Sequence, residues 1–167
     1  MSVLTKIKAT FRSLLRKQEL EQDLMWLVTI TQLADACVEL GDSERYRVFA
    51  DLLAPFGDRL IVVGYGVLTT GSVARVLGRL HSGLRQWRRA GELFEQALEL
   101  ERRAGAHVWL PYTHRDYATM LIQEGRSHSS RRCVELVNSG LEIAGSVGAS
   151  SPAHELRRLA RTAAALA

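Results

Sequence analysis

The chain has 167 residues, of which 47% are hydrophobic and 24% charged, with a formal net charge of +4 and two cysteines. A chain of this size forms one ordinary domain whose core needs neither a metal nor a disulfide. No apolar run approaches the roughly 20 residues of a membrane span, and residues 1–20 lack the apolar segment and cleavage site of a secretory signal. We therefore expect a cytoplasmic protein with no membrane span.

Residues 1–22 are predicted to form a separate, basic amphipathic helix. Four apolar residues recur at helical spacing, and five basic residues lie mostly on the other side: Val3, Ile7, Phe11 and Leu14 against Lys6, Lys8, Arg12, Arg16 and Lys17. A helix of this kind binds an anionic membrane or a partner helix. The pattern favours the simpler role of a capping helix that packs on the rest of the chain.

Residues 23–167 are predicted to form a domain of antiparallel helix hairpins. Gly41 ends one helix, Asp42 or Ser43 caps the next, and Pro55 ends that helix in turn. After Gly71 the helical pattern resumes, with breaks at 82–86, 105–107, 124–127 and 147–151. The fold class is therefore all-α.

One segment, LIVVGYGVLTTGSVARVLG from Leu60 to Gly78, has the strand, glycines and helix of a nucleotide-binding loop. The dinucleotide motif G-x-G-x-x-G fails because Thr69 replaces its third glycine, and the P-loop motif fails because Ser72 replaces its lysine. A single strand-like run also cannot build the parallel sheet that such loops require. We expect the glycines to serve backbone turns, and we expect no nucleotide to bind.

Small and large residues alternate in two consecutive predicted helices, Ala74-x-x-Leu77-Gly78-x-x-His81 and Ala90-x-x-x-Phe94-x-x-Ala97. This spacing resembles the tetratricopeptide pattern, in which small residues lie at helix crossings and an aromatic residue fills the space between repeats. The resemblance implies a right-handed stack of about three antiparallel helix hairpins with extra N- and C-terminal helices. It also places Phe94 and Ala97 in the core.

Residues 24–147 more specifically resemble the C-terminal helical-repeat region of large bacterial signalling ATPases and of nucleotide-cyclase-like or transcriptional regulators. The resembling blocks are WLVTITQLADACVELGD, LLAPFGDRLIVVGYGVLTTGSVARVLGRL and ELFEQALELERRAGAHVWLPYTHRDYATML, followed by EGR. The resemblance implies a role in bacterial signalling or transcriptional regulation. The catalytic and DNA-binding parts of those regulators lie outside the resembling stretch.

The titratable residues do not form a pattern typical of catalysis. His114 and Asp116 are two residues apart on a predicted helix and so face different directions, and with His107 we interpret them as helix-end and surface residues. Cys37 and Cys133 are expected to be buried free thiols. The glutamates of residues 92–101 are expected to pair weakly with nearby arginines. We predict no active site, no metal and no cofactor.

The first helix of each predicted pair, about 72–83 and 110–124, lines the concave side in tetratricopeptide-like stacks. Arg75 and Arg79 are four residues apart and share a face, which we expect to point away from the buried stripe. An arginine-and-tyrosine groove of this kind suits an acidic peptide or a chain terminus. The predicted partner-binding residues are Arg75, Arg79, Tyr112 and Arg115. Alternatively, Asp35 and Glu39 on the comparable face of the first predicted hairpin pair with these arginines.

The sequence thus predicts a non-enzymatic protein–protein interaction module. Two alternatives stay open: a sensor domain that binds a small ligand in its groove, and a helical-repeat nucleic-acid binder. Basic residues are interleaved with glutamates rather than massed in one tract, which favours a solvated surface over a nucleic-acid interface. A homodimer is compatible with the sequence.

Overall fold

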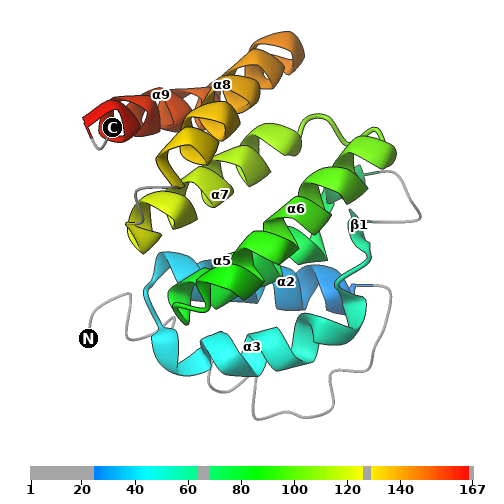
Figure 1. Cartoon of the computed structure of the whole chain (residues 1–167). Coiled ribbons are helices and arrows are strands. Elements are labelled where there is room, and N and C mark those ends of the chain that lie inside the picture. The colour runs from blue at the N-terminus through cyan, green and yellow to red at the C-terminus, as the bar shows by residue number, and fades with distance from the viewer. Residues whose placement is uncertain (1–24, 64–67, 126–128, 166–167) are drawn as a thin grey trace, which may run out of the picture.

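The computed structural model describes residues 25–63, 68–125 and 129–165 (Figure 1). The predicted N-terminal helix, 1–22, and the predicted turns at Gly64 and Gly66 lie outside these ranges. The helices of the described ranges are α2 (Trp26–Glu39), α3 (Tyr46–Leu53), α5 (Val73–Gly83), α6 (Trp87–Arg103), α7 (Leu110–Glu124), α8 (Ser129–Val147) and α9 (Ser150–Ala165). All four predicted breaks between helices after Gly71 are confirmed, and the chain is mostly helical as expected.

Two strands, β1 (Leu60–Val63) and β2 (Leu68–Ser72), form a small antiparallel sheet. Leu60 lies opposite Ser72 and Val63 opposite Leu68. Only one strand-like run was predicted here, because LTTGS is too polar to be recognised as a strand. Within β2, Gly71 has a φ of +101°, a backbone conformation that glycine adopts without steric cost. This is a backbone role for Gly71, of the kind that the sequence predicted.

Helix ends follow local chemistry, with one difference from expectation. Gly125 ends α7 in the left-handed conformation, and its N–H donates to the Leu121 carbonyl. Pro111 lies in the first turn of α7, where its missing N–H costs no helical hydrogen bond. Neither Asp42 nor Ser43 caps α3, which begins after Arg45 without a side-chain cap. The Asp42 carboxylate pairs instead with Arg45, at the end of a short 3₁₀ turn that precedes the helix.

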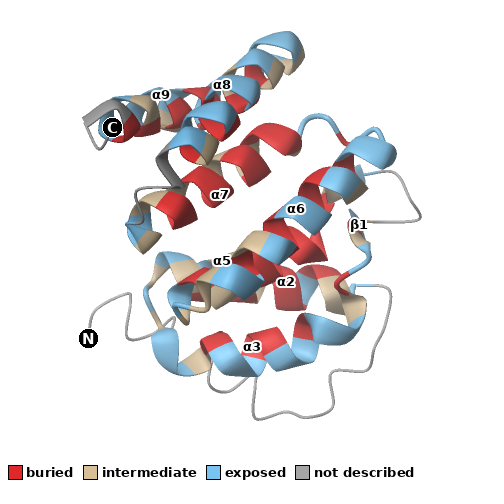
Figure 2. Cartoon of the chain, in the orientation of Figure 1, coloured by how far each residue is buried: buried red, intermediate tan, exposed pale blue. Residues whose placement is uncertain are grey.

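The apolar side chains gather in two core clusters, visible where buried surfaces of neighbouring helices face one another (Figure 2). The first cluster joins α2, α3, β1 and α5 with Leu93 of α6, and the second joins α6 to α9. Phe94 and Ala97 on α6 are fully buried, which confirms their predicted place in the core. The predicted burial of Cys37 and Cys133 as free thiols is also confirmed.

Helix α5 lies between the two clusters and packs against α2, α3, α6 and α7. Its crossing with α6 depends on Gly78, because a Cβ atom there would lie 2.8 Å from the Phe94 ring. The small residue and the aromatic ring of the predicted repeat pattern therefore meet at a helix crossing. Since neighbours surround α5, polar residues on this helix are buried along with apolar ones.

Candidate functional site

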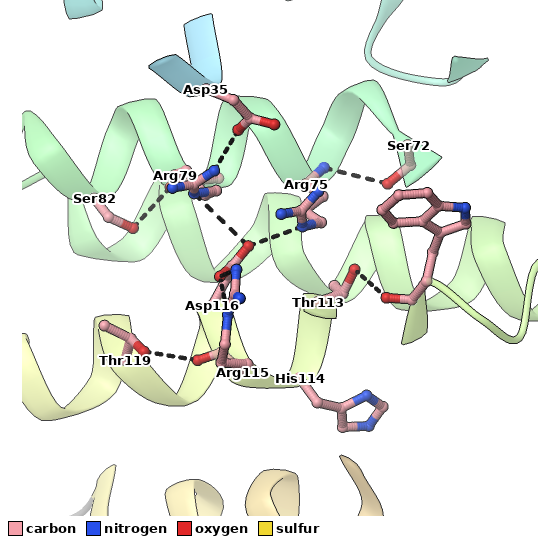
Figure 3. A network of polar contacts seen from close by, with 12 residues as sticks. Asp35, Ser72, Arg75, Arg79, Ser82, Thr113, His114, Arg115, Asp116 and Thr119 are labelled. Atoms are coloured by element: carbon pink, nitrogen blue, oxygen red, sulfur yellow. Dashed lines mark hydrogen bonds and ion pairs between the residues drawn. The ribbon is translucent and has the colours of Figure 1, made fainter. Parts of the chain in front are cut away.

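Asp116 on α7 is a buried carboxylate at the interface between α5 and α7 (Figure 3). Arg75 Nε donates to its Oδ2 at 2.8 Å, and Arg115 donates to its Oδ1 through Nε at 2.9 Å and Nη2 at 2.7 Å. Arg79 Nε lies 3.7 Å from Oδ2. Burial by itself raises the pKa of Asp116, but the three guanidinium groups outweigh it, so the pKa is lower than usual.

The same arginines connect Asp116 to two further helices. Arg79 forms ion pairs with Asp35 and Glu39 on α2, and Arg115 Nη1 lies 3.3 Å from Glu155 Oε1 on α9. Burial tends to lower the pKa of Arg79 and Arg115, yet the carboxylates raise both pKa values overall, so both stay cationic. We call these seven residues the Asp116 cluster: Asp35, Glu39, Arg75, Arg79, Arg115, Asp116 and Glu155.

The structure brings the four predicted partner-binding residues together, but around a carboxylate of the chain itself. The guanidinium carbons of Arg75 and Arg115 lie 5.9 and 5.5 Å from the centroid of the Tyr112 ring. Arg75 does not lie on an open partner-binding face as predicted, because α7 covers that face of α5 and Arg75 is only 5% exposed. The alternative pairing of Arg79 with Asp35 and Glu39 is confirmed.

Two residues that the sequence analysis placed on the surface are buried. His114 is 4% and Asp116 9% exposed, whereas His107 is exposed as expected. His114 and Asp116 do face different directions on α7, as their spacing predicted (Figure 3). A signal for Asp116 was available, because polar residues at 112, 115, 116 and 119 form a stripe with i, i+3, i+4, i+7 spacing along one helix face.

A second buried carboxylate, Glu101 at the end of α6, was also missed. It is fully buried and forms no ion pair with any described residue, contrary to its expected pairing with an arginine, whereas Glu92, Glu95 and Glu99 do pair with arginines. Its Oε1 accepts from Ser72 Oγ at 2.7 Å and Ser72 N at 3.2 Å, and its Oε2 accepts from Thr113 Oγ1 at 2.7 Å. Burial raises the pKa of Glu101 above its usual value, and these hydrogen bonds and the charge of Arg75 only partly offset the rise.

A groove of about 390 Å³ lies beside the Asp116 cluster. Its lining comes mostly from α2, α5, α7 and α9, namely Val38, Glu39, Arg79, Ser82, Gly83, Arg115, Asp116, Thr119, Met120, Gln123, Glu155 and Arg158, with Tyr46 and Phe94 from α3 and α6. Gln123 and Arg158 are exposed. Among the described residues, Arg158 has no ion-pair partner, so its guanidinium is available to a ligand.

The groove therefore has a charge-paired floor and a polar rim, an arrangement suited to recognition by hydrogen bonds.

Across residues 25–63, 68–125 and 129–165, no three His, Cys, Asp or Glu side chains are placed to hold a metal ion. No helix in those ranges is both long and apolar enough to cross a bilayer. In comparisons with known proteins, no protein-family model matches the chain, and no curated protein is significantly similar to it in sequence.

Proposed function

We propose that this chain is a non-enzymatic interaction module, a tetratricopeptide-like stack of helix pairs whose groove binds an extended segment of a protein partner. One observation carries the proposal: the groove is lined mostly by α2, α5, α7 and α9, and α2, α5 and α7 are the first helices of the pairs α2–α3, α5–α6 and α7–α8. In tetratricopeptide-like stacks the first helices line the concave face, and such concave faces are the usual binding surfaces of helical repeats.

The chemistry of the groove limits what kind of segment it accepts. Arg79 and Arg115 already pair with carboxylates of the chain, so a strongly acidic partner would have to displace these carboxylates. Thr119, Gln123 and Arg158 supply hydrogen-bonding groups at the rim, while Met120 contributes apolar surface. This combination suits a peptide of mixed polarity that places one carboxylate or carbonyl group against Arg158.

The family resemblance of residues 24–147 supplies the setting of the proposal. In this proposal, the chain acts in the bacterial cytoplasm as the partner-recognising part of a signalling or transcriptional regulator. The volume of the groove lies within the range of small-molecule sites, roughly 300–1,000 Å³, so a ligand-sensing role is the alternative that the experiment must separate.

Selection from a random peptide library tests the proposal. Peptides selected on the parent chain are measured against Thr119→Arg, which places a long side chain in the groove, and against Arg158→Glu. The matched control is Arg157→Glu, because Arg157 is an exposed neighbour on α9 that does not line the groove. We expect both groove variants to weaken peptide binding at least tenfold and the control to leave it unchanged.

Two outcomes contradict the proposal. Equal binding of the selected peptides to the parent and to correctly folded groove variants excludes the groove as the site. Failure to select any peptide, together with thermal stabilisation of the parent but not of Thr119→Arg by a small-molecule library, favours the sensor instead.

A further inference from the structure

His114 presents an unused hydrogen-bond acceptor on the side of α7 that faces away from the Asp116 cluster (Figure 3). Its Nδ1 lies 2.7 Å from the Leu110 carbonyl oxygen, so Nδ1 must carry the proton and donate it. In the neutral ring the other nitrogen, Nε2, then holds a lone pair and can only accept. Burial lowers the pKa of His114, which keeps the ring neutral.

Close packing of α8 on α7 fixes the position of this imidazole. A Cβ atom at Gly140 would lie 2.9 Å from the His114 Cβ atom and 2.9 Å from a methyl group of Leu156. Glycine is therefore the residue that lets α8 approach α7 closely enough to bury the base of His114. No described side chain donates to Nε2, and this atom is not sealed from solvent. It must therefore be open to the adjoining space.

That space is a pocket of about 370 Å³ between α6, α7 and α8. Leu98 and Leu136 provide its apolar wall, and the remaining lining residues are Glu95, Glu99, Arg102, His114, Arg132, Glu135 and Ser139. Each of the carboxylates already has an arginine partner: Glu95 and Arg132 are 2.7 Å apart, Glu99 and Arg102 3.4 Å, and Glu135 and Arg131 3.2 Å. The pocket wall thus has no unpaired carboxylate to attract a cation.

We propose that this pocket is a binding site for small, uncharged hydroxyl compounds of the phenol or alcohol class, whose O–H donates to His114 Nε2. Two features select this chemistry. The lone pair of Nε2 requires a donor, and the paired charges of the wall give no net attraction to an ion. The site is separate from the proposed peptide groove, because His114 lines only the pocket and Asp116 only the groove.

Phenol and anisole are the matched probes, since they differ in the O–H group and share the ring. Each is titrated into the full chain while long-range proton–nitrogen NMR follows the imidazole nitrogens of His114. We expect phenol to shift the Nε2 resonance with saturation, and anisole to bind about tenfold more weakly because it cannot donate, as the loss of one hydrogen bond implies. Equal affinity for the two probes, or no saturable shift with phenol, overturns the proposal.

A pair of variants that leaves His114 intact locates the site. Ser139→Trp places a bulky side chain at the pocket, whereas Asn138→Trp places the same side chain at an exposed neighbouring position that does not line it. We expect Ser139→Trp to weaken phenol binding at least tenfold and Asn138→Trp to leave it unchanged. If phenol binds both variants like the parent, its site lies elsewhere and the proposal is wrong.

Discussion

Asp116 and Glu101 are both buried carboxylates that help to hold α7 in place, but they are surrounded by opposite kinds of partner. Three guanidinium groups surround Asp116, whereas two hydroxyl groups and one backbone N–H donate to Glu101. Burial raises the pKa of either group, and only the charged partners reverse the shift, at Asp116. At Glu101 the neutral hydrogen bonds and the charge of Arg75 offset only part of the rise that burial causes, whereas the three guanidinium groups outweigh it at Asp116.

The two carboxylates consequently have opposite effects on stability as pH changes. The lowered pKa of Asp116 means that its contribution is present above its usual pKa and is lost as pH falls through the lowered folded-state value. The raised pKa of Glu101 means that the folded chain holds this proton more tightly than the unfolded chain. The free energy of unfolding therefore decreases as pH rises from the usual glutamate pKa through the raised value.

The largest effect is expected from breaking the Asp116 cluster. Asp116→Asn removes the negative charge and leaves the buried Arg75 without its ion-pair partner and the partly buried Arg115 with Glu155 alone, which costs about 3–5 kcal/mol for a buried ion pair. Chemical denaturation monitored by circular dichroism measures the change. Asp58→Asn is the control, because Asp58 is exposed and should change the free energy of unfolding by less than about 0.5 kcal/mol. A similarly small effect of Asp116→Asn would contradict a stabilising role for the cluster.

Glu101→Gln tests whether the raised pKa of Glu101 makes the free energy of unfolding depend on pH. Glutamine has nearly the same shape and can retain the contacts with Ser72 and Thr113, so we expect its free energy of unfolding at pH 7 to differ from the parent by less than about 1 kcal/mol. The stability of the variant relative to the parent should increase as pH rises from the usual glutamate pKa through the raised value. Denaturation from pH 4 to 8 tests this, with the exposed Glu99→Gln as control. A relative stability that is constant or decreases with pH would contradict the raised pKa.

The smallest effect is expected at the outer edge of the Asp116 cluster. The Glu39 side chain is 70% exposed although it pairs with Arg79, and exposed ion pairs contribute little because water and salt screen them. We expect Glu39→Gln to lower the free energy of unfolding by less than about 1 kcal/mol, and less at 1 M salt. Thermal melts at low and high salt provide the measurement. A loss as large as that of Asp116→Asn would show that the two ends of the cluster are equally important.

Several features of the fold follow from local sequence signals. Gly125 ends α7 within the break predicted at 124–127, and the spacing of Gly78 and Phe94 predicted a helix crossing that the structure contains. These predictions succeeded because each depends on a local property. A helix end depends on the backbone conformation of a few adjacent residues, and a helix crossing depends on the sizes of the side chains along one helix face. The second strand was missed because Leu68–Ser72 pairs with β1 and is covered by Trp109, whose Nε1 donates to the Thr69 carbonyl.

The candidate site was only partly predictable. Helical spacing placed Arg75 and Arg79 on one helix face. Asp35 and Glu39 were predicted as alternative partners of these arginines, and the structure confirms this pairing for Arg79. The central role of Asp116 was missed, because an aspartate in a charged helix is usually solvated. Its burial depends on how α7 lies against α5, a contact between residues about 40 positions apart in the chain.

The sequence by itself determined the breaks between the helices after Gly71, the burial of Phe94 and Ala97, and the close approach of α5 and α6 at Gly78. Periodicity and residue size act within a few turns of one helix, so they can be recognised without knowledge of the fold. Only the tertiary structure decided that arginines surround the Asp116 carboxylate and lower its pKa, that burial raises the pKa of Glu101, and that His114 lines a pocket. The electrostatic state of a buried group depends on the charges and the loss of water around it in space, and residues from distant parts of the chain provide both.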